Sequence, residues 1–164
     1  MQTSSLNLYL LLVSSFLMAL LLSVYPLPME CRWWRPEFVL LVAIYWIIAM
    51  PFNISLLALC GLGLFQDLLE GVPFGQHSLG LIVVSYFCLF SYQRVRNFNW
   101  LKQSISVLVM VTVAQLTDNW VQGMAGRPLA GIHFVFSAIS SAIAWPLVRY
   151  LLDYLANKMR VSPS

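Results

Sequence analysis

Two acidic residues lie within long apolar stretches of this 164-residue chain. Asp67 lies about thirteen residues into one stretch, and Asp118 lies about seventeen residues into another. A carboxylate inside a membrane span is costly, so it marks either a functional site or a specific packing contact. Gln115, Asp118, Asn119 and Gln122 lie at positions i, i+3, i+4 and i+7. This spacing predicts one polar stripe on a helix, facing other helices or a wet cavity.

Other signals of catalysis or cofactor binding are weak. His77 follows a glycine-containing turn and His133 opens the last apolar stretch, and neither has a nearby acid in the sequence to orient it. The GxSxG, P-loop and GxGxxG patterns do not occur. Cys31, Cys60 and Cys88 form no CxxC or Cys/His cluster, so neither a disulfide framework nor a metal site is predicted. We expect no catalytic residue, no cofactor and no metal.

The composition is that of a membrane protein. Hydrophobic residues make up 60% of the chain and charged residues 9%, and the mean hydropathy is +0.81. Soluble domains average about a quarter charged residues, and this chain lacks the polar coat that so large an apolar core would need. We predict one integral membrane domain over residues 1–164, with the lipid bilayer around it and no nucleic acid as partner.

Six apolar stretches predict an all-α, polytopic bundle of six transmembrane helices. The stretches are residues 6–27, 38–50, 54–69, 78–92, 101–121 and 129–152. The first has about the length needed to cross a bilayer, and it lacks the basic region and cleavage site of a signal peptide. Only Pro51, Phe52 and Asn53 separate the second from the third. This break favours two antiparallel helices over one long helix.

The basic residues predict the orientation, because cytoplasmic loops are enriched in Lys and Arg. With six spans both termini lie on one side of the membrane. That side carries six cations: Arg94, Arg96, Lys102, Arg149, Lys158 and Arg160. The opposite side carries three: Arg32, Arg35 and Arg127. The N- and C-termini are therefore predicted to be cytoplasmic. Five spans would divide the two strongest basic clusters between the two sides, which favours six.

The acids and arginines of the outer side allow two interpretations. One is a functional pocket lined by Asp67, Asp118 and one or more of the three outer arginines. The other, which we favour, is a network of ion pairs and hydrogen bonds that fixes the bundle, where each polar contact contributes about 1 kcal/mol. An enzyme acting on lipid-linked precursors would also need a metal, and no third ligand accompanies the two acids.

Three segments together resemble one family. They are WRPEFVLLVAIYWIIAMP at 34–51, GLGLFQDLLEGVPFGQHSLG at 61–80 and YQRVRNFNWLKQ at 92–103. Over nearly its whole length the chain resembles the proteobacterial form of MreD, the rod shape-determining inner-membrane protein. The resemblance implies structural or partner-binding roles for the motif positions Arg35, Pro36, Asp67, Gly71 and Gly75. It also matches Asp118 to an acid within the fifth span of similar sequences.

The resemblance implies a non-enzymatic scaffold of the cell-wall elongation complex in the bacterial inner membrane. It implies an MreC-like bitopic protein as partner. Through that protein it implies indirect links to the actin-like MreB, the glycosyltransferase RodA and the elongation-specific class B penicillin-binding protein. The implied fold is similar to the substrate-binding components of energy-coupling-factor transporters. The alternative function is therefore a small-solute binding subunit of a membrane transporter. The predicted group of polar residues on the outer side also favours this alternative.

Overall fold

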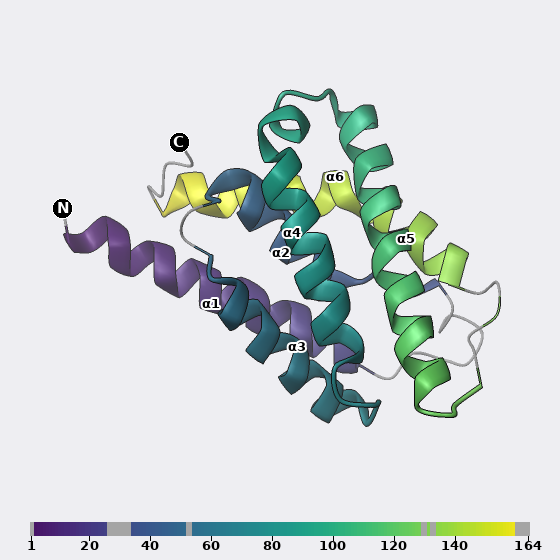
Figure 1. The fold of residues 1–164 in the computed structure, drawn as a ribbon. Helices are drawn as coiled ribbons and strands as arrows, with labels where there is room; N and C mark the ends of the chain where they lie inside the picture. The colour runs from purple at the N-terminus through teal and green to yellow at the C-terminus, as the bar shows by residue number, and fades with distance from the viewer. Residues whose placement is uncertain (1, 26–33, 52–53, 129–130, 132–133, 160–164) are drawn as a thin grey trace.

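The computed structural model describes residues 2–25, 34–51, 54–128, 131 and 134–159 (Figure 1). The helices within these ranges are α1 (Gln2–Val24), α2 (Phe38–Ala49), α3 (Leu56–Glu70), α4 (Gln76–Arg96), α5 (Trp100–Met124) and α6 (Phe134–Lys158). Each predicted span coincides with one helix, so the all-α prediction is confirmed. Several helices continue past their apolar stretches. Helix α4 reaches Arg96 and α6 reaches Lys158, because polar residues extend a helix as well as apolar ones do.

The prediction of six transmembrane helices is confirmed in part. Among the residues that the structure describes, four helices are long and apolar enough to cross a membrane, with the qualifying segments Leu6–Val24, Gln76–Arg96, Trp100–Met124 and Val135–Lys158. Helix α2 has 12 residues, a length of about 18 Å. This is well short of the roughly 30 Å hydrocarbon core of a bilayer, and apolar helices of about 10–14 residues are more often buried core helices.

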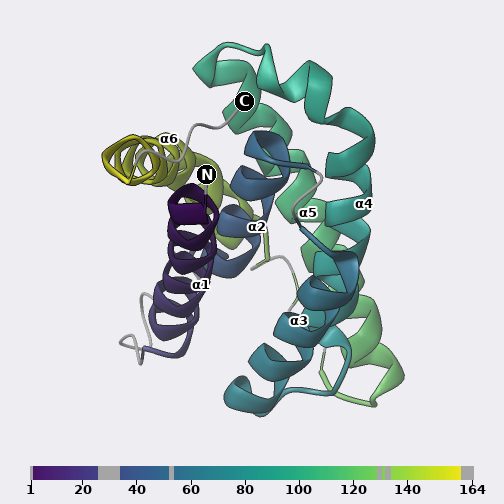
Figure 2. The same cartoon turned by 90° about the vertical axis from the view of Figure 1, so that its left-hand side faces the viewer.

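Helix α2 is the core of the bundle. Every residue from Val39 to Ile48 is buried, and α2 contacts α1, α4, α5 and α6. Figure 2 shows α2 between α1 and α6 on one side and α4 and α5 on the other. A helix that is apolar on all faces has no side that favours water, which fits a central position. Pro36 precedes the helix and Pro51 follows it, and both restrict its extension.

Two polar side chains fix α2 against its neighbours. The indole nitrogen of Trp46 donates to the hydroxyl of Ser15 on α1 at 2.9 Å. The hydroxyl of Tyr45 donates to Asp153 Oδ1 on α6 at 2.7 Å. Polar contacts between membrane helices add about 1 kcal/mol each. They also fix the rotation of a helix whose apolar surface is similar on all sides.

Helices α3 and α4 pack with their backbones unusually close. A Cβ atom placed on Gly63 would lie 2.4 Å from the Cα atom of Ser78. The hydroxyl of Ser78 donates to the carbonyl oxygen of Cys60 at 3.2 Å, which adds a polar contact at the same level. Small residues at such contacts let membrane helices approach each other. The α3–α4 hairpin therefore requires glycine at position 63.

We predict that Gly63→Ala destabilises the protein, whereas Gly61→Ala does not. At position 63 the new methyl group collides with the backbone of α4, and overpacking of this kind costs roughly 1–3 kcal/mol. A Cβ at Gly61 meets no atom within 4 Å. There alanine gains roughly 0.5–1 kcal/mol through its helix propensity. Thermal unfolding of the purified variants in detergent measures both effects, and equal midpoints would contradict the close packing at Gly63.

Candidate functional site

The Asp67 carboxylate joins the end of α3 to the beginning of α4. Its Oδ2 accepts a hydrogen bond from the backbone N–H of Gly75, and its Oδ1 accepts one from the N–H of His77, each at 2.8 Å. Asp67 is 0% exposed. Gly75, the N-cap residue of α4, has no side chain to satisfy these groups, so Asp67 takes the capping role. A negative charge at a helix N-terminus is also favoured by the helix dipole.

The turn between these helices uses the predicted motif glycines. Gly71 ends α3 in the left-handed region at φ 65°, and Gly75 precedes α4 at φ 94°. The carbonyl oxygen of Asp67 accepts a hydrogen bond from the N–H of Val72 at 3.2 Å. Left-handed backbone is readily adopted by glycine and costs other residues about 1–2 kcal/mol. Asp67, Gly71 and Gly75 therefore form one local unit that reverses the chain.

His77 belongs to the same unit. Its Nδ1 lies 2.9 Å from Asp67 Oδ1, and its Nε2 lies 3.7 Å from Glu70 Oε2. In the sequence His77 has no nearby acid to orient it, because Asp67 is ten positions away. The turn brings them together. An acid in the last turn of one helix and a histidine in the first turn of the next are the signal that could have identified the pair.

Glu70 connects α3 to two other parts of the bundle. Its Oε1 accepts hydrogen bonds from the hydroxyl of Ser23 on α1 at 3.2 Å and from the amide of Gln66 at 3.0 Å. The same oxygen lies 4.0 Å from the Arg35 guanidinium, just before α2. Gln66 also donates to Ser23, at 3.3 Å. Glu70 is therefore more than a surface charge, because it links α1, α3 and the segment that enters α2.

Two residues of the predicted polar stripe on α5, Gln115 and Asp118, face the interior of the bundle. The amide of Gln115 donates to Glu37 Oε1 at 2.7 Å. Asp118 is 6% exposed, and its Oδ1 has no hydrogen-bond partner among the residues that the structure describes. A Cβ on Gly80 would lie 2.9 Å from that oxygen. Glycine at position 80 therefore leaves room for the Asp118 carboxylate against α4.

Glu37 was not among the residues that the sequence singled out. It lies at the start of α2, where its backbone N–H donates to the hydroxyl of Ser141 on α6 at 3.0 Å. The loss of water around its carboxyl group raises the pKa of Glu37 above its ordinary value. Its partners lie far along the chain, so no sequence spacing indicates them.

The three arginines that the sequence predicts on the outer side are in three different situations. Arg35 joins the cluster through Glu70, and its backbone carbonyl accepts a hydrogen bond from Ser137 at 2.9 Å. Arg127 lies at the exposed side of the α3–α4 turn, where its guanidinium donates to the carbonyl of Gly71 at 3.4 Å. Arg32 and His133 lie outside the described residues.

Pro36 lies between Arg35 and α2, and its carbonyl accepts a hydrogen bond from the N–H of Phe38 at 3.0 Å.

We give the name polar cluster to Glu37, Gln66, Asp67, Glu70, His77, Gln115 and Asp118 together. The cluster has little free space. Glu37, Gln66, His77 and Asp118 border a cavity of about 10 Å³. A cavity of this size holds about one water molecule, whereas pockets for small organic ligands measure roughly 300–1,000 Å³. Asp67 orients the imidazole of His77, an arrangement that acid–base catalysts also use. The cavity beside His77 is too small for a substrate. Within the described ranges, no group of three or more His, Cys, Asp or Glu side chains could hold a metal ion.

Comparison with known proteins now identifies the family. The family model of the rod shape-determining protein MreD matches residues 3–155. The chain belongs to the MreD family. A relative, the rod shape-determining protein MreD of Haemophilus influenzae, is 27% identical over 161 residues, which cover 98% of this chain and 99% of the relative. Membership in this family, together with the four helices able to cross a membrane, makes the chain a multi-pass membrane protein.

No solved structure matches the chain significantly. The similarity to substrate-binding components of energy-coupling-factor transporters therefore stays a prediction from resemblance.

We predict that Asp67→Ala destabilises the bundle more than Glu70→Ala. The first change leaves two backbone N–H groups of α4 and the His77 ring without their acceptor, at a cost of about 3 kcal/mol. The Glu70 side chain is 20% exposed, so water replaces part of what it loses, and we expect about 1 kcal/mol. Thermal unfolding in detergent measures the difference.

Asp67→Asn is the matched variant, because it keeps one acceptor oxygen and the shape of the side chain. We expect its midpoint to lie between those of wild type and Asp67→Ala. Equal midpoints for Asp67→Ala and Glu70→Ala would show that capping of α4 by Asp67 contributes no more than an ordinary polar contact.

Proposed function

We propose that this protein is a non-enzymatic scaffold of the cell-wall elongation complex in the bacterial inner membrane. In this proposal it binds an MreC-like bitopic protein and, through it, links MreB, RodA and the elongation-specific class B penicillin-binding protein to peptidoglycan synthesis. Both termini lie in the cytoplasm. Membership in a rod shape-determining family supports the role in cell shape. The observation that carries the scaffold role is the use of the buried polar side chains for contacts between helices.

The polar cluster supports a scaffold because its residues hold helices rather than a ligand. Asp67 accepts three hydrogen bonds from the start of α4. Glu70 contacts side chains of α1 and α3 and the segment before α2. A partner cannot touch Asp67, which is fully buried. In our proposal Asp67 acts on the partner indirectly, by fixing the outer ends of α3 and α4.

The α3–α4 turn offers the partner a defined surface. Phe74 lies in this turn and is 72% exposed, between the two glycines of positive φ. Aromatic side chains contribute much of the binding energy of protein interfaces. A rigid turn that presents one aromatic ring loses little entropy when a partner binds. We therefore assign the partner contact to the outer turn, with Phe74 as its centre.

The transporter alternative finds no support in the polar cluster. The about 10 Å³ cavity between Glu37, His77 and Asp118 is too small for a solute larger than water. A solute-binding subunit would need a larger cavity lined by polar groups. Co-purification of an ATPase module with the native protein would favour that alternative over the scaffold.

We predict that depletion of the protein in its native cells turns rods into spheres and releases the MreC-like partner from the rest of the complex. A scaffold is needed in stoichiometric amounts, so shape should change as the protein is diluted by growth. Microscopy and a crosslinked pull-down from native membranes measure the two effects. Unchanged rods with an intact complex would contradict the proposal.

We further predict that Phe74→Ala lowers recovery of the partner while leaving the thermal stability of the protein unchanged. An interface hot spot costs about 2 kcal/mol or more on truncation to alanine, which corresponds to a loss of binding of at least roughly thirtyfold. Leu57→Ala is the matched control, since Leu57 is also apolar, is 84% exposed and lies at the opposite end of α3.

Recovery of the partner by Phe74→Ala at the level of Leu57→Ala would place the contact elsewhere on the protein. Such a result would leave the scaffold role itself to the depletion experiment.

A further inference from the structure

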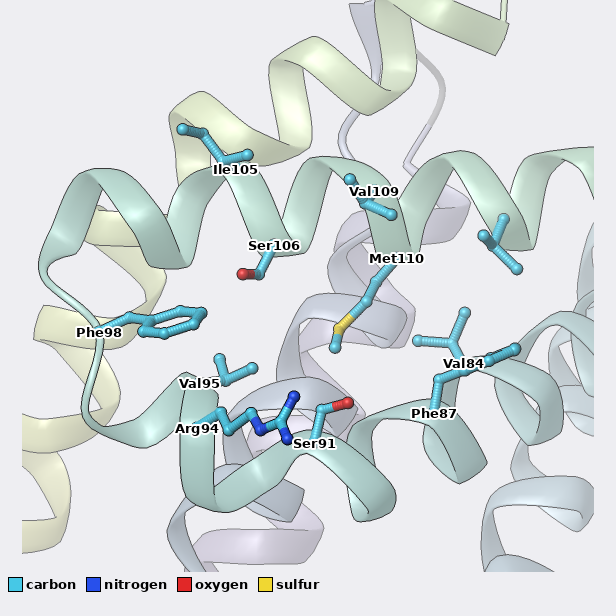
Figure 3. A pocket seen from close by; sticks show the side chains of 11 residues that line it. Val84, Phe87, Ser91, Arg94, Val95, Phe98, Ile105, Ser106, Val109 and Met110 are labelled. Atoms are coloured by element: carbon cyan, nitrogen blue, oxygen red, sulfur yellow. The ribbon is translucent and has the colours of Figure 1, made fainter.

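A groove lies between α4 and α5, at the end of the bundle opposite the polar cluster. Its volume is about 420 Å³. Val84 and Phe87 of α4 and Val109 and Met110 of α5 form its apolar walls. Figure 3 shows the Arg94 side chain beside Ser91 at one end of the groove, close to Phe98 in the α4–α5 connector. The groove is therefore apolar along its length and cationic at its connector end.

The length of the groove matches one leaflet of a bilayer. Its lining on α4 runs from Val84 to Arg94, ten residues or about 15 Å of helix. The hydrocarbon core of a bilayer is roughly 30 Å thick, so each leaflet accounts for about half of it. One acyl chain of a lipid in the leaflet next to the connector would lie along the groove, with its headgroup at the level of Arg94.

The groove opens onto the lipid-facing surface of the protein. Phe87 is 53% exposed, Val109 is 55% exposed and Ile105 is 62% exposed. In a multi-pass membrane protein, apolar side chains exposed on long spanning helices face lipid tails. Trp100, 76% exposed at the start of α5, has the position of an aromatic anchor at the membrane–water interface. The connector end of the groove therefore lies at headgroup level.

The charge at this end favours an anion. Arg94 is exposed, and its guanidinium forms no hydrogen bond or ion pair with any residue that the structure describes. Arg96 and Lys102 lie on the two sides of the same connector. Residues 92–103 contain no acidic residue, and Asp153 of α6 lies 3.6 Å from a different cation, Arg149. The connector thus keeps a net positive charge for a ligand.

We propose that the α4–α5 groove binds an anionic phospholipid, with an acyl chain along Phe87 and Val109 and the phosphate at Arg94. The Ser91 hydroxyl, beside Arg94, adds a donor for the phosphate oxygens. Basic pockets between membrane helices bind anionic headgroups in this way. The site is separate from the outer turn to which we assign the partner, so lipid binding does not depend on the scaffold role.

Native mass spectrometry of the full-length protein in detergent tests this proposal, with phosphatidylglycerol and phosphatidylcholine of equal chain length as probes. We expect wild type to retain phosphatidylglycerol in preference to phosphatidylcholine. Arg94→Gln should weaken retention of phosphatidylglycerol roughly fivefold, since one surface cation contributes about 1 kcal/mol to binding an anionic lipid. Arg127→Gln removes one positive charge at the opposite end and should leave retention unchanged.

A second pair of variants tests the acyl-chain half of the site without changing charge. Val109→Trp fills the groove and should reduce retention of phosphatidylglycerol, whereas Leu116→Trp, on the same helix but outside the groove, should not. Equal retention of the two lipids by wild type would overturn the proposal. Arg94→Gln behaving like Arg127→Gln would do the same, as would Val109→Trp behaving like Leu116→Trp. A groove that receives a helix of another protein would give these contrary results.

Discussion

The bundle depends on one buried carboxylate. Asp67 satisfies two backbone N–H groups at the start of α4 with its side chain, and its own carbonyl closes the end of α3. Helix α4 in turn packs against α2, α3 and α5. The direction in which α4 leaves the turn therefore determines how α4 packs against the central helix α2. A charge that is expensive inside a membrane is tolerated here because every hydrogen bond it accepts comes from a group that also needs a partner.

The acids were visible in the sequence, but most of their partners were not. Asp67 and Asp118 stand out because each interrupts an apolar stretch. His77 follows Asp67 by ten positions, and only the folded turn makes them neighbours. Glu37 and Gln115 are 78 positions apart. Helical spacing shows which residues share a face, but it carries no information about which other helix meets that face. For that reason the outer cluster was predicted as a region and not as a set of contacts.

The positions of the helices were more predictable than their environments. Proline and glycine mark the ends of α2 and α3, and the apolar stretches between them became helices. Hydropathy measures the avoidance of water, which a lipid tail and a protein interior satisfy equally well. Helix α2 is apolar throughout because protein surrounds it. Helix α1 is apolar because many of its side chains lie on the surface of the bundle, where a membrane protein meets lipid. Length distinguishes the two cases, since a 12-residue helix is too short to cross the hydrocarbon core of a bilayer.

The central position of α2 has a consequence for the order in which the chain assembles. Proteins are synthesised from the N-terminus, so α2 enters the membrane when only α1 is available to cover it. The Trp46–Ser15 hydrogen bond can form at that stage. The contacts of Tyr45 with Asp153 and of Glu37 with Ser141 must wait for the last helix to be made. A short apolar helix thus remains partly uncovered until α6, whose contacts with it come more than a hundred positions later in the chain, has been made.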